Sequence, residues 1–206
     1  MQLRNTPDRW GAVHQIVHWV IAPLALLQIG FGGYIGGLLP EDIERSTAYG
    51  VHVSLGLLIL LLMIVRLVWR LANPVPRMPQ RLGRPERALA RTTHYGFYVL
   101  LIVQPIVGYL MASARDSPLT FLGATLPAAM APNEPLATVF AYAHLIIAAL
   151  LILTVALHVA GALRHELILR DNTLRRMTPL SPREGDYRAR TTERASEAEG
   201  PLARRR

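Results

Sequence analysis

Residues 136–163 read LATVFAYAHLIIAALLILTVALHVAGAL, a strongly apolar stretch that indicates the fold class of the chain. It belongs to an uncharged segment, residues 135–163, that exceeds the roughly 20 apolar residues a helix needs to cross a bilayer. The segment carries two histidines, His144 and His158. Ionisable side chains are costly inside a membrane, so both histidines are candidates for function.

Three further uncharged segments have comparable lengths, at residues 10–40, 46–65 and 92–114. We therefore predict an all-α integral membrane protein, a four-helix bundle with spans at about residues 12–36, 46–70, 92–114 and 136–166. The spans form one membrane domain over residues 1–180. The polar, arginine-rich segment 181–206 is predicted to be a disordered cytoplasmic tail. No internal repeat is evident.

The distribution of the 22 arginines sets the predicted orientation. With the N-terminus inside, 20 arginines lie on the inner side and two, Arg45 and Arg115, on the outer side. The positive-inside rule then places both termini in the cytoplasm. The positive-inside rule explains the net charge of +8, so no nucleic-acid partner is expected. The absence of cysteine excludes thiolate metal sites, c-type haem attachment and dithiol redox chemistry.

Four histidines form two pairs by depth. His144 and His158 are 14 residues apart, which places both on nearly the same face of a helix, roughly 21 Å apart along its axis. His18 lies at the inner level of the first span and His52 at the outer level of the second. Depth therefore pairs His18 with His158 and His52 with His144.

Two facing histidines without cysteine or carboxylate suit the axial positions of a b-type haem better than zinc, which takes three or four protein ligands. We predict two b-type haems, the inner iron on His18 and His158 and the outer iron on His52 and His144. Small residues at the same levels leave room for a porphyrin: Ala22, Gly32, Gly56, Ala148 and Ala162. Small residues also simply allow close packing of membrane helices.

Other polar residues in the spans have two interpretations each. Arg66, 14 residues after His52, either pairs with a propionate of the inner haem or snorkels as an interfacial anchor. His14 is interpreted as an interfacial residue rather than a propionate contact. Gln104 is interpreted as the group that satisfies the carbonyl freed by Pro105, rather than as a cofactor contact.

These residues resemble the bacterial cytochrome b561 family, four-helix di-haem proteins of the inner membrane. The resemblance covers roughly residues 11–180 and rests on residues 18–19 (HW), 51–54 (VHVS), 65–67 (VRL), 105–108 (PIVG), 171–174 (DNTL) and the spacing of the last histidine pair. It implies that His18, His52, His144 and His158 are the axial haem ligands. It also implies that His94 contacts a haem propionate or a quinone.

The resemblance implies electron transfer linked to the quinone pool, because similar members oxidise superoxide at the outer face and reduce ubiquinone. We expect a quinone-linked oxidoreductase in a bacterial inner membrane, with superoxide or a partner redox protein as donor and ubiquinone as acceptor. Five acidic residues and two arginines in the outer loops argue against steering of an anionic donor. The alternatives are a haem b membrane anchor that relays electrons from a partner dehydrogenase or hydrogenase to quinone, and a haem-free transporter or scaffold.

Overall fold

The computed structural model describes residues 2–7, 9–37, 43–77, 83–117, 119–170, 173–174 and 177–178, with the main chain alone for residues 43–46. In this part of the chain, four helices are long and apolar enough to cross a membrane. They are α1 Ala12–Gly37, α2 Ile43–Leu71, α3 Arg84–Ala114 and α4 Glu134–Leu163, which continues into a π-helix, η1 Arg164–Leu169. The predicted tail, together with Asp171 and Asn172, lies outside the described residues.

Helix α3 begins eight residues before the uncharged segment 92–114. Gly83 caps its start, and the Glu86 carboxylate accepts a hydrogen bond of 3.0 Å from the Gly83 N–H. The same carboxylate forms an ion pair of 2.8 Å with Arg164 at the end of α4. The charged residues 84–91 are therefore part of the helix, and the cap and the ion pair stabilise its first turn. Hydropathy alone predicts only the part of the helix that crosses the membrane.

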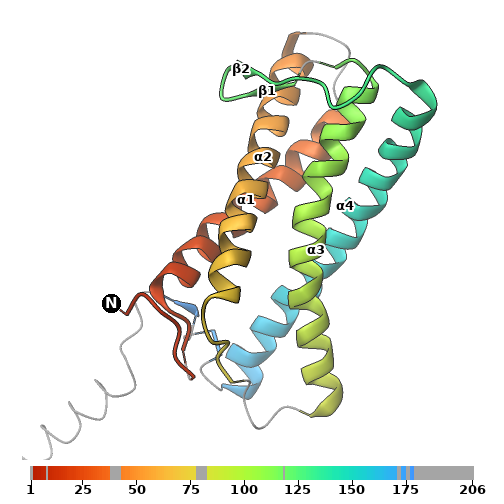
Figure 1. The fold of residues 1–206 in the computed structure, drawn as a ribbon. Coiled ribbons are helices and arrows are strands. Elements are labelled where there is room, and N and C mark those ends of the chain that lie inside the picture. Colours follow the sequence, from red (N-terminus) through yellow and green to blue (C-terminus); the bar gives the residue numbers. More distant parts are fainter. Residues whose placement is uncertain are drawn as a thin grey trace, which may run out of the picture.

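A short β-hairpin at one end departs from the all-α prediction (Figure 1). Its strands, β1 Thr120–Phe121 and β2 Ala124–Thr125, pair in antiparallel register. Ser54 of α2 donates a hydrogen bond of 3.2 Å to the Thr120 carbonyl, and the Tyr109 hydroxyl donates to the Pro127 carbonyl. These bonds fix the α3–α4 connection over what we call the hairpin end of the bundle.

The opposite end, which we call the terminus end, is closed by segments from both ends of the chain. Asn5 donates a hydrogen bond of 2.9 Å to the Pro74 carbonyl, which ties the N-terminal segment to the end of α2. Trp19 of α1 donates a bond of 2.7 Å to the Met177 carbonyl after η1. The terminus end is therefore held by contacts between residues far apart in the sequence.

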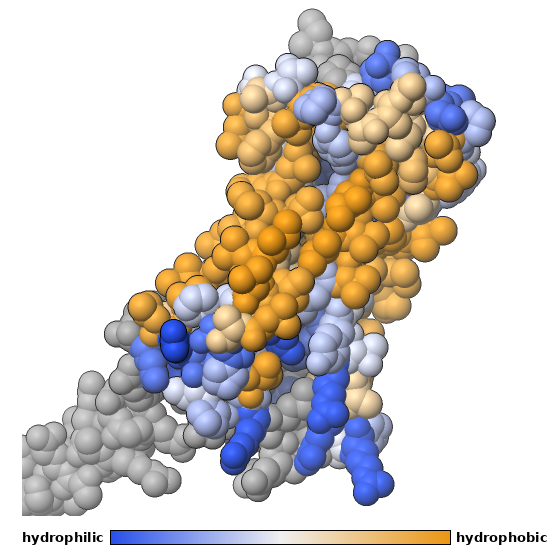
Figure 2. Space-filling view, in the orientation of Figure 1, coloured by the Kyte–Doolittle hydropathy of each residue, from blue (hydrophilic) through white to orange (hydrophobic). Residues whose placement is uncertain are grey.

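The helices pack as two pairs, α1 on α2 and α3 on α4, and the pairs meet mainly through α2 and α3. On the face drawn in Figure 2, hydrophobic residues cover the middle of the bundle and polar residues gather toward its two ends. Buried side chains from all four helices form the core: Ile21, Ala25, Ile59, Met63, Leu101 and Leu151. The four apolar helices fit a protein that crosses a membrane several times.

Candidate haem sites

Two pairs of histidine rings face each other across helices. At the hairpin end, the rings of His52 and His144 have centroids 6.3 Å apart and planes inclined at 74°. At the terminus end, the corresponding values for His18 and His158 are 6.1 Å and 74°. We call these the hairpin-side pair and the terminus-side pair. The structure thus brings together the same two pairs of histidines that were predicted from their depth in the membrane.

The geometry of each pair fits a metal held by two imidazoles. Bonds of about 2.0–2.1 Å from two ring nitrogens to one metal place the ring centroids roughly 6 Å apart. Among the described residues, no group of three or more His, Cys, Asp or Glu side chains is arranged to hold a metal ion. The donor set therefore suits a cofactor that needs two protein ligands and brings its own equatorial ligands, as haem does.

Glycines line the hairpin-side pair on its two remaining helices. A Cβ atom on Gly32 of α1 would lie 3.3 Å from Cε1 of His52. A Cβ atom on Gly108 of α3 would lie 3.0 Å from Cε1 of His144 and 3.3 Å from its Nδ1. Glycine at both positions therefore leaves room for the ring edges, which a side chain there would crowd. Gly32 is among the small residues predicted from the sequence to make room for a porphyrin, whereas Gly108 is not.

Two glutamines reach the same histidines from neighbouring helices. Nε2 of Gln28 in α1 donates a hydrogen bond of 2.7 Å to the carbonyl of His52 in α2. Nε2 of Gln104 in α3 donates a bond of 3.1 Å to the carbonyl of His144 in α4. The interpretation that Gln104 serves the carbonyl freed by the proline is thus corrected. Gln28 was not among the predicted site residues, although a polar glutamine inside a membrane span is itself a signal of function.

The two helix pairs repeat the same pattern of residues. His18, Gln28 and Gly32 of α1 recur 76 residues later in α3 as His94, Gln104 and Gly108. The α2 residues His52 and Arg66 correspond, 92 residues later, to His144 and His158 of α4. The equivalent glutamines and glycines also make equivalent contacts. The chain therefore contains an internal repeat, contrary to our expectation from the sequence.

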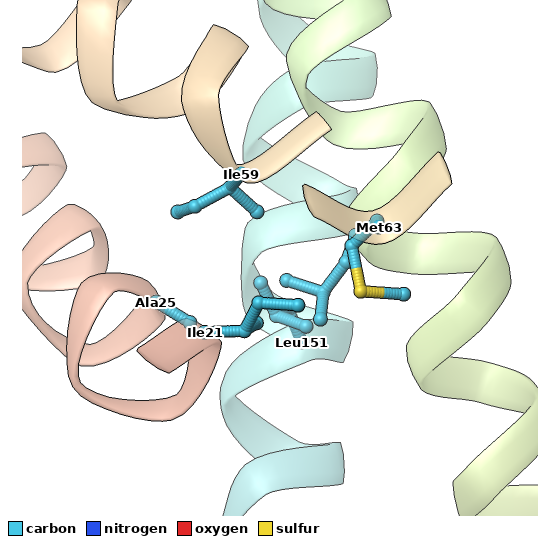
Figure 3. Close-up of a cluster of buried hydrophobic side chains, with 6 residues drawn as sticks. Ile21, Ala25, Ile59, Met63 and Leu151 are labelled. Carbon is cyan, nitrogen blue, oxygen red and sulfur yellow. The ribbon is translucent and has the colours of Figure 1, made fainter. Parts of the chain in front are cut away.

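An apolar layer separates the two levels. Each helix places one core residue seven positions from both levels: Ala25, Ile59, Leu101 and Leu151. All four have at most 8% of their surface exposed and belong to one cluster. Figure 3 shows Ala25, Ile59 and Leu151 converging from three helices. Buried apolar side chains therefore lie midway between the two histidine pairs.

The terminus-side pair has a third imidazole beside it. The His94 ring of α3 lies 5.7 Å from that of His158, and Phe97 packs edge-on against His158 at 5.2 Å. The Trp19 ring lies 5.3 Å from that of His18. The two levels therefore differ, because α3 contributes a glycine to the hairpin-side pair and a histidine to the terminus-side pair.

Arg66 lies in α2 at the level of the terminus-side pair. Its guanidinium is 3.2 Å from Nε2 of His14, whose ring stacks on Trp10 with centroids 4.0 Å apart. No acidic side chain among the described residues forms an ion pair with Arg66. His14 is only 2% exposed, so its ring is buried within the protein near the start of α1, and its depth at the membrane interface stays a prediction. The arrangement leaves the Arg66 charge free to meet an anionic group of a ligand.

Comparisons with known proteins identify the family of this chain. The sequence profile of the prokaryotic cytochrome b561 family matches residues 9–180. "Cytochrome b561 homolog 2" of Escherichia coli is 29% identical over 188 residues, covering 91% of this chain and 99% of that protein. "Probable superoxide oxidase CybB" of Yersinia pestis is 31% identical over 164 residues, covering 79% of this chain and 92% of that protein. The chain therefore belongs to the prokaryotic cytochrome b561 family, membrane electron-transfer proteins with b-type haem.

Proposed function

We propose that this protein transfers electrons across the membrane through two b-type haems, one held by His52 and His144 and the other by His18 and His158. The observation that carries the proposal is the presence of two facing imidazole pairs, at 6.3 Å and 6.1 Å, in a member of a b-type cytochrome family. When bound, haem supplies a one-electron ferric/ferrous couple. Two imidazoles would hold each haem, and this donor set would favour electron transfer over oxygen binding.

The apolar layer between the two levels supports this role. The levels are 14 residues apart on each helix, roughly 21 Å along the axis. Ala25, Ile59, Leu101 and Leu151 exclude water from the space between them, because hydrocarbon offers no hydrogen-bond partner to water or to a proton. Electrons would therefore pass between the levels without an accompanying proton path through this layer.

Polar residues at the terminus-side level would anchor the cofactor there. We assign Arg66 to a propionate, because its buried charge has no acidic partner among the described side chains. His94 would contact either a propionate or a quinone. A His94→Ala variant separates these roles: a shifted potential of the terminus-side haem indicates the propionate, and impaired quinone reduction with an unchanged potential indicates the quinone.

The arginine distribution supports a cytoplasmic terminus end and an outward-facing hairpin end. Superoxide oxidation at the hairpin end with ubiquinone as acceptor is the specific reaction we propose. It is supported by the similarity to a protein named probable superoxide oxidase. Two superoxide anions would each give up one electron to form oxygen, and one ubiquinone would take two electrons and two protons to form ubiquinol. Arg115 at the end of α3 is the cation we assign to attracting the anion.

A redox spectrum with a haem-to-protein ratio tests the core of the proposal. Two haems per chain, both reducible, are expected, and an absence of haem contradicts the proposal. Stopped-flow reduction of the purified protein by superoxide, with ubiquinone as acceptor, tests the specific reaction. Reduction no faster than spontaneous dismutation allows would reject superoxide as the donor. A stable complex with a dehydrogenase or hydrogenase after gentle extraction would then favour the membrane-anchor alternative.

A further inference from the structure

We propose that Gln28 and Gln104 are positioning residues for the hairpin-side haem. Each would hold one haem histidine through its backbone carbonyl and supply the acceptor for the hydrogen on that histidine's Nδ1. This inference rests on the proposed haem binding by His52 and His144. It predicts that the two glutamines tune one haem and leave the other unchanged.

The first observation is a pair of matching hydrogen bonds. Gln28 donates to the His52 carbonyl at 2.7 Å, and Gln104 donates to the His144 carbonyl at 3.1 Å. Each bond crosses from one helix to its partner at the residue that carries the ligand ring. A carbonyl oxygen has two lone pairs, so it accepts this bond in addition to its own helical bond. The two glutamines thus fix the helices at the ligand positions themselves.

The second observation is a matching set of unpaired atoms. Nδ1 of His52 and Nδ1 of His144 are buried with no hydrogen-bond partner among the described residues, and so are Oε1 of Gln28 and Oε1 of Gln104. A neutral imidazole that binds a metal through one nitrogen carries its hydrogen on the other. Each helix pair therefore holds one buried donor and one buried acceptor. The structure does not join them, and a hydrogen bond from Nδ1–H of each histidine to Oε1 of the glutamine on the neighbouring helix would satisfy all four atoms.

The third observation is the internal repeat. Gln28 and Gln104 are equivalent positions, each followed four residues later by the glycine that contacts the same histidine ring. Gly56 of α2 is a detail of the Gln28 side alone, because a Cβ atom there would lie 3.0 Å from Nε2 of Gln28, whereas the equivalent position in α4 is Ala148. The Gln28 amide therefore lies in a space that only a residue without a side chain leaves open.

The test compares Gln28→Leu and Gln104→Leu with the unmodified protein by optical redox titration of both haems. An acceptor on Nδ1–H makes the imidazole a stronger electron donor and favours ferric iron, so its loss should raise the potential of the hairpin-side haem. We expect about a tenfold shift in its redox equilibrium, about 59 mV for one electron, in each variant. The terminus-side haem of the same molecule is the control and should keep its potential.

Two further variants keep the test decisive if leucine impairs assembly. Gln28→Glu retains an acceptor oxygen and should bring the potential down from its raised value in Gln28→Leu, whereas Gly56→Ala should displace the amide and raise the potential of the hairpin-side haem as leucine does. Unchanged potentials in all variants, or equal shifts of both haems, overturn the inference. Absence of haem from the unmodified protein contradicts the proposed function instead, so the two failures are distinguishable.

Discussion

A guanidinium nitrogen of Arg66 lies 3.2 Å from Nε2 of the buried His14. Guanidinium nitrogens only donate hydrogen bonds, so Nε2 accepts and the neutral ring carries its hydrogen on Nδ1. Trp10 stacks on that ring with planes inclined at 15°, which fixes the acceptor in place. The start of α1 therefore orients a charged side chain of α2 at the level of the terminus-side pair.

Replacing Arg66 should lower the potential of the terminus-side haem. A positive charge beside a propionate favours the ferrous form. Arg66→Gln should therefore reduce the stability of ferrous relative to ferric haem by about 1.4 kcal/mol, which lowers the potential by about 59 mV for one electron. His14→Ala should shift the potential the same way by less, because the arginine remains but loses its acceptor. Redox titration measures both effects.

Arg70→Gln is the control for this prediction. Arg70 lies one turn from Arg66 but stacks over the rings of Tyr95 and Tyr98, at 5.7 Å and 5.3 Å. Its loss should change the potential much less. A shift as large as that of Arg66→Gln would mean that any nearby charge has the effect and would contradict a specific propionate contact.

Single histidine substitutions should remove one haem at a time. His52→Ala and His144→Ala should each lose the hairpin-side haem, because an alanine leaves one axial position of its iron without a protein ligand. His18→Ala and His158→Ala should each lose the other haem. Haem-to-protein ratios should fall from two to one, and difference spectra identify the remaining haem. Loss of the same haem from His52→Ala and His158→Ala would refute the pairing.

Alanine at the glycines should disturb the hairpin-side haem in a graded order. Gly108→Ala places a methyl group 3.0 Å from the His144 ring and should have the largest effect, and Gly32→Ala places one 3.3 Å from the His52 ring. Gly33→Ala is the matched control, because its methyl group meets nothing within 4 Å. Haem content and the spectrum of the reduced protein measure the order. An effect of Gly33→Ala equal to that of Gly108→Ala would argue against ring crowding.

The packing of the terminus end depends on the absence of a side chain at Gly11. A Cβ atom there would lie 2.3 Å from the Leu3 carbonyl oxygen, and the Gly11 N–H donates to the Asn5 side chain. Gly11→Ala should destabilise the protein by about 1–3 kcal/mol, because backbone has to move. At about 2–4 °C per kcal/mol for a chain of this size, the loss is measurable as a lower Tm in detergent. Gly36→Ala, with open space around its Cβ, should leave the Tm nearly unchanged.

The main features of the fold follow from the sequence because burial in lipid leaves strong signals. Long uncharged segments mark the four apolar helices, and helix geometry places His18 with His158 and His52 with His144. The start of α3 at Arg84 was missed because hydropathy identifies only apolar segments, and the first residues of this helix are largely charged. The β-hairpin was missed because two-residue strands leave almost no periodic pattern.

The contacts of the sites were harder to predict for a different reason. Gln28 and Gln104 bond to backbone carbonyls, and every residue has a carbonyl, so their partners leave no trace in the sequence. The burial of His14 depends on where the N-terminal segment folds back. The repeat of His18, Gln28 and Gly32 in α3 is visible in the sequence, but only the matching contacts show which positions correspond.

The internal repeat suggests how such a protein arises. His52 and His144 occupy equivalent positions in the two helix pairs, so two identical copies of a single two-helix chain would bring the same two rings together on their shared axis. His18 and His158 are not equivalent, and an identical pair of chains would form that contact twice. Gene duplication followed by divergence at Arg66 would then convert a symmetric assembly into one chain whose two ends are chemically different.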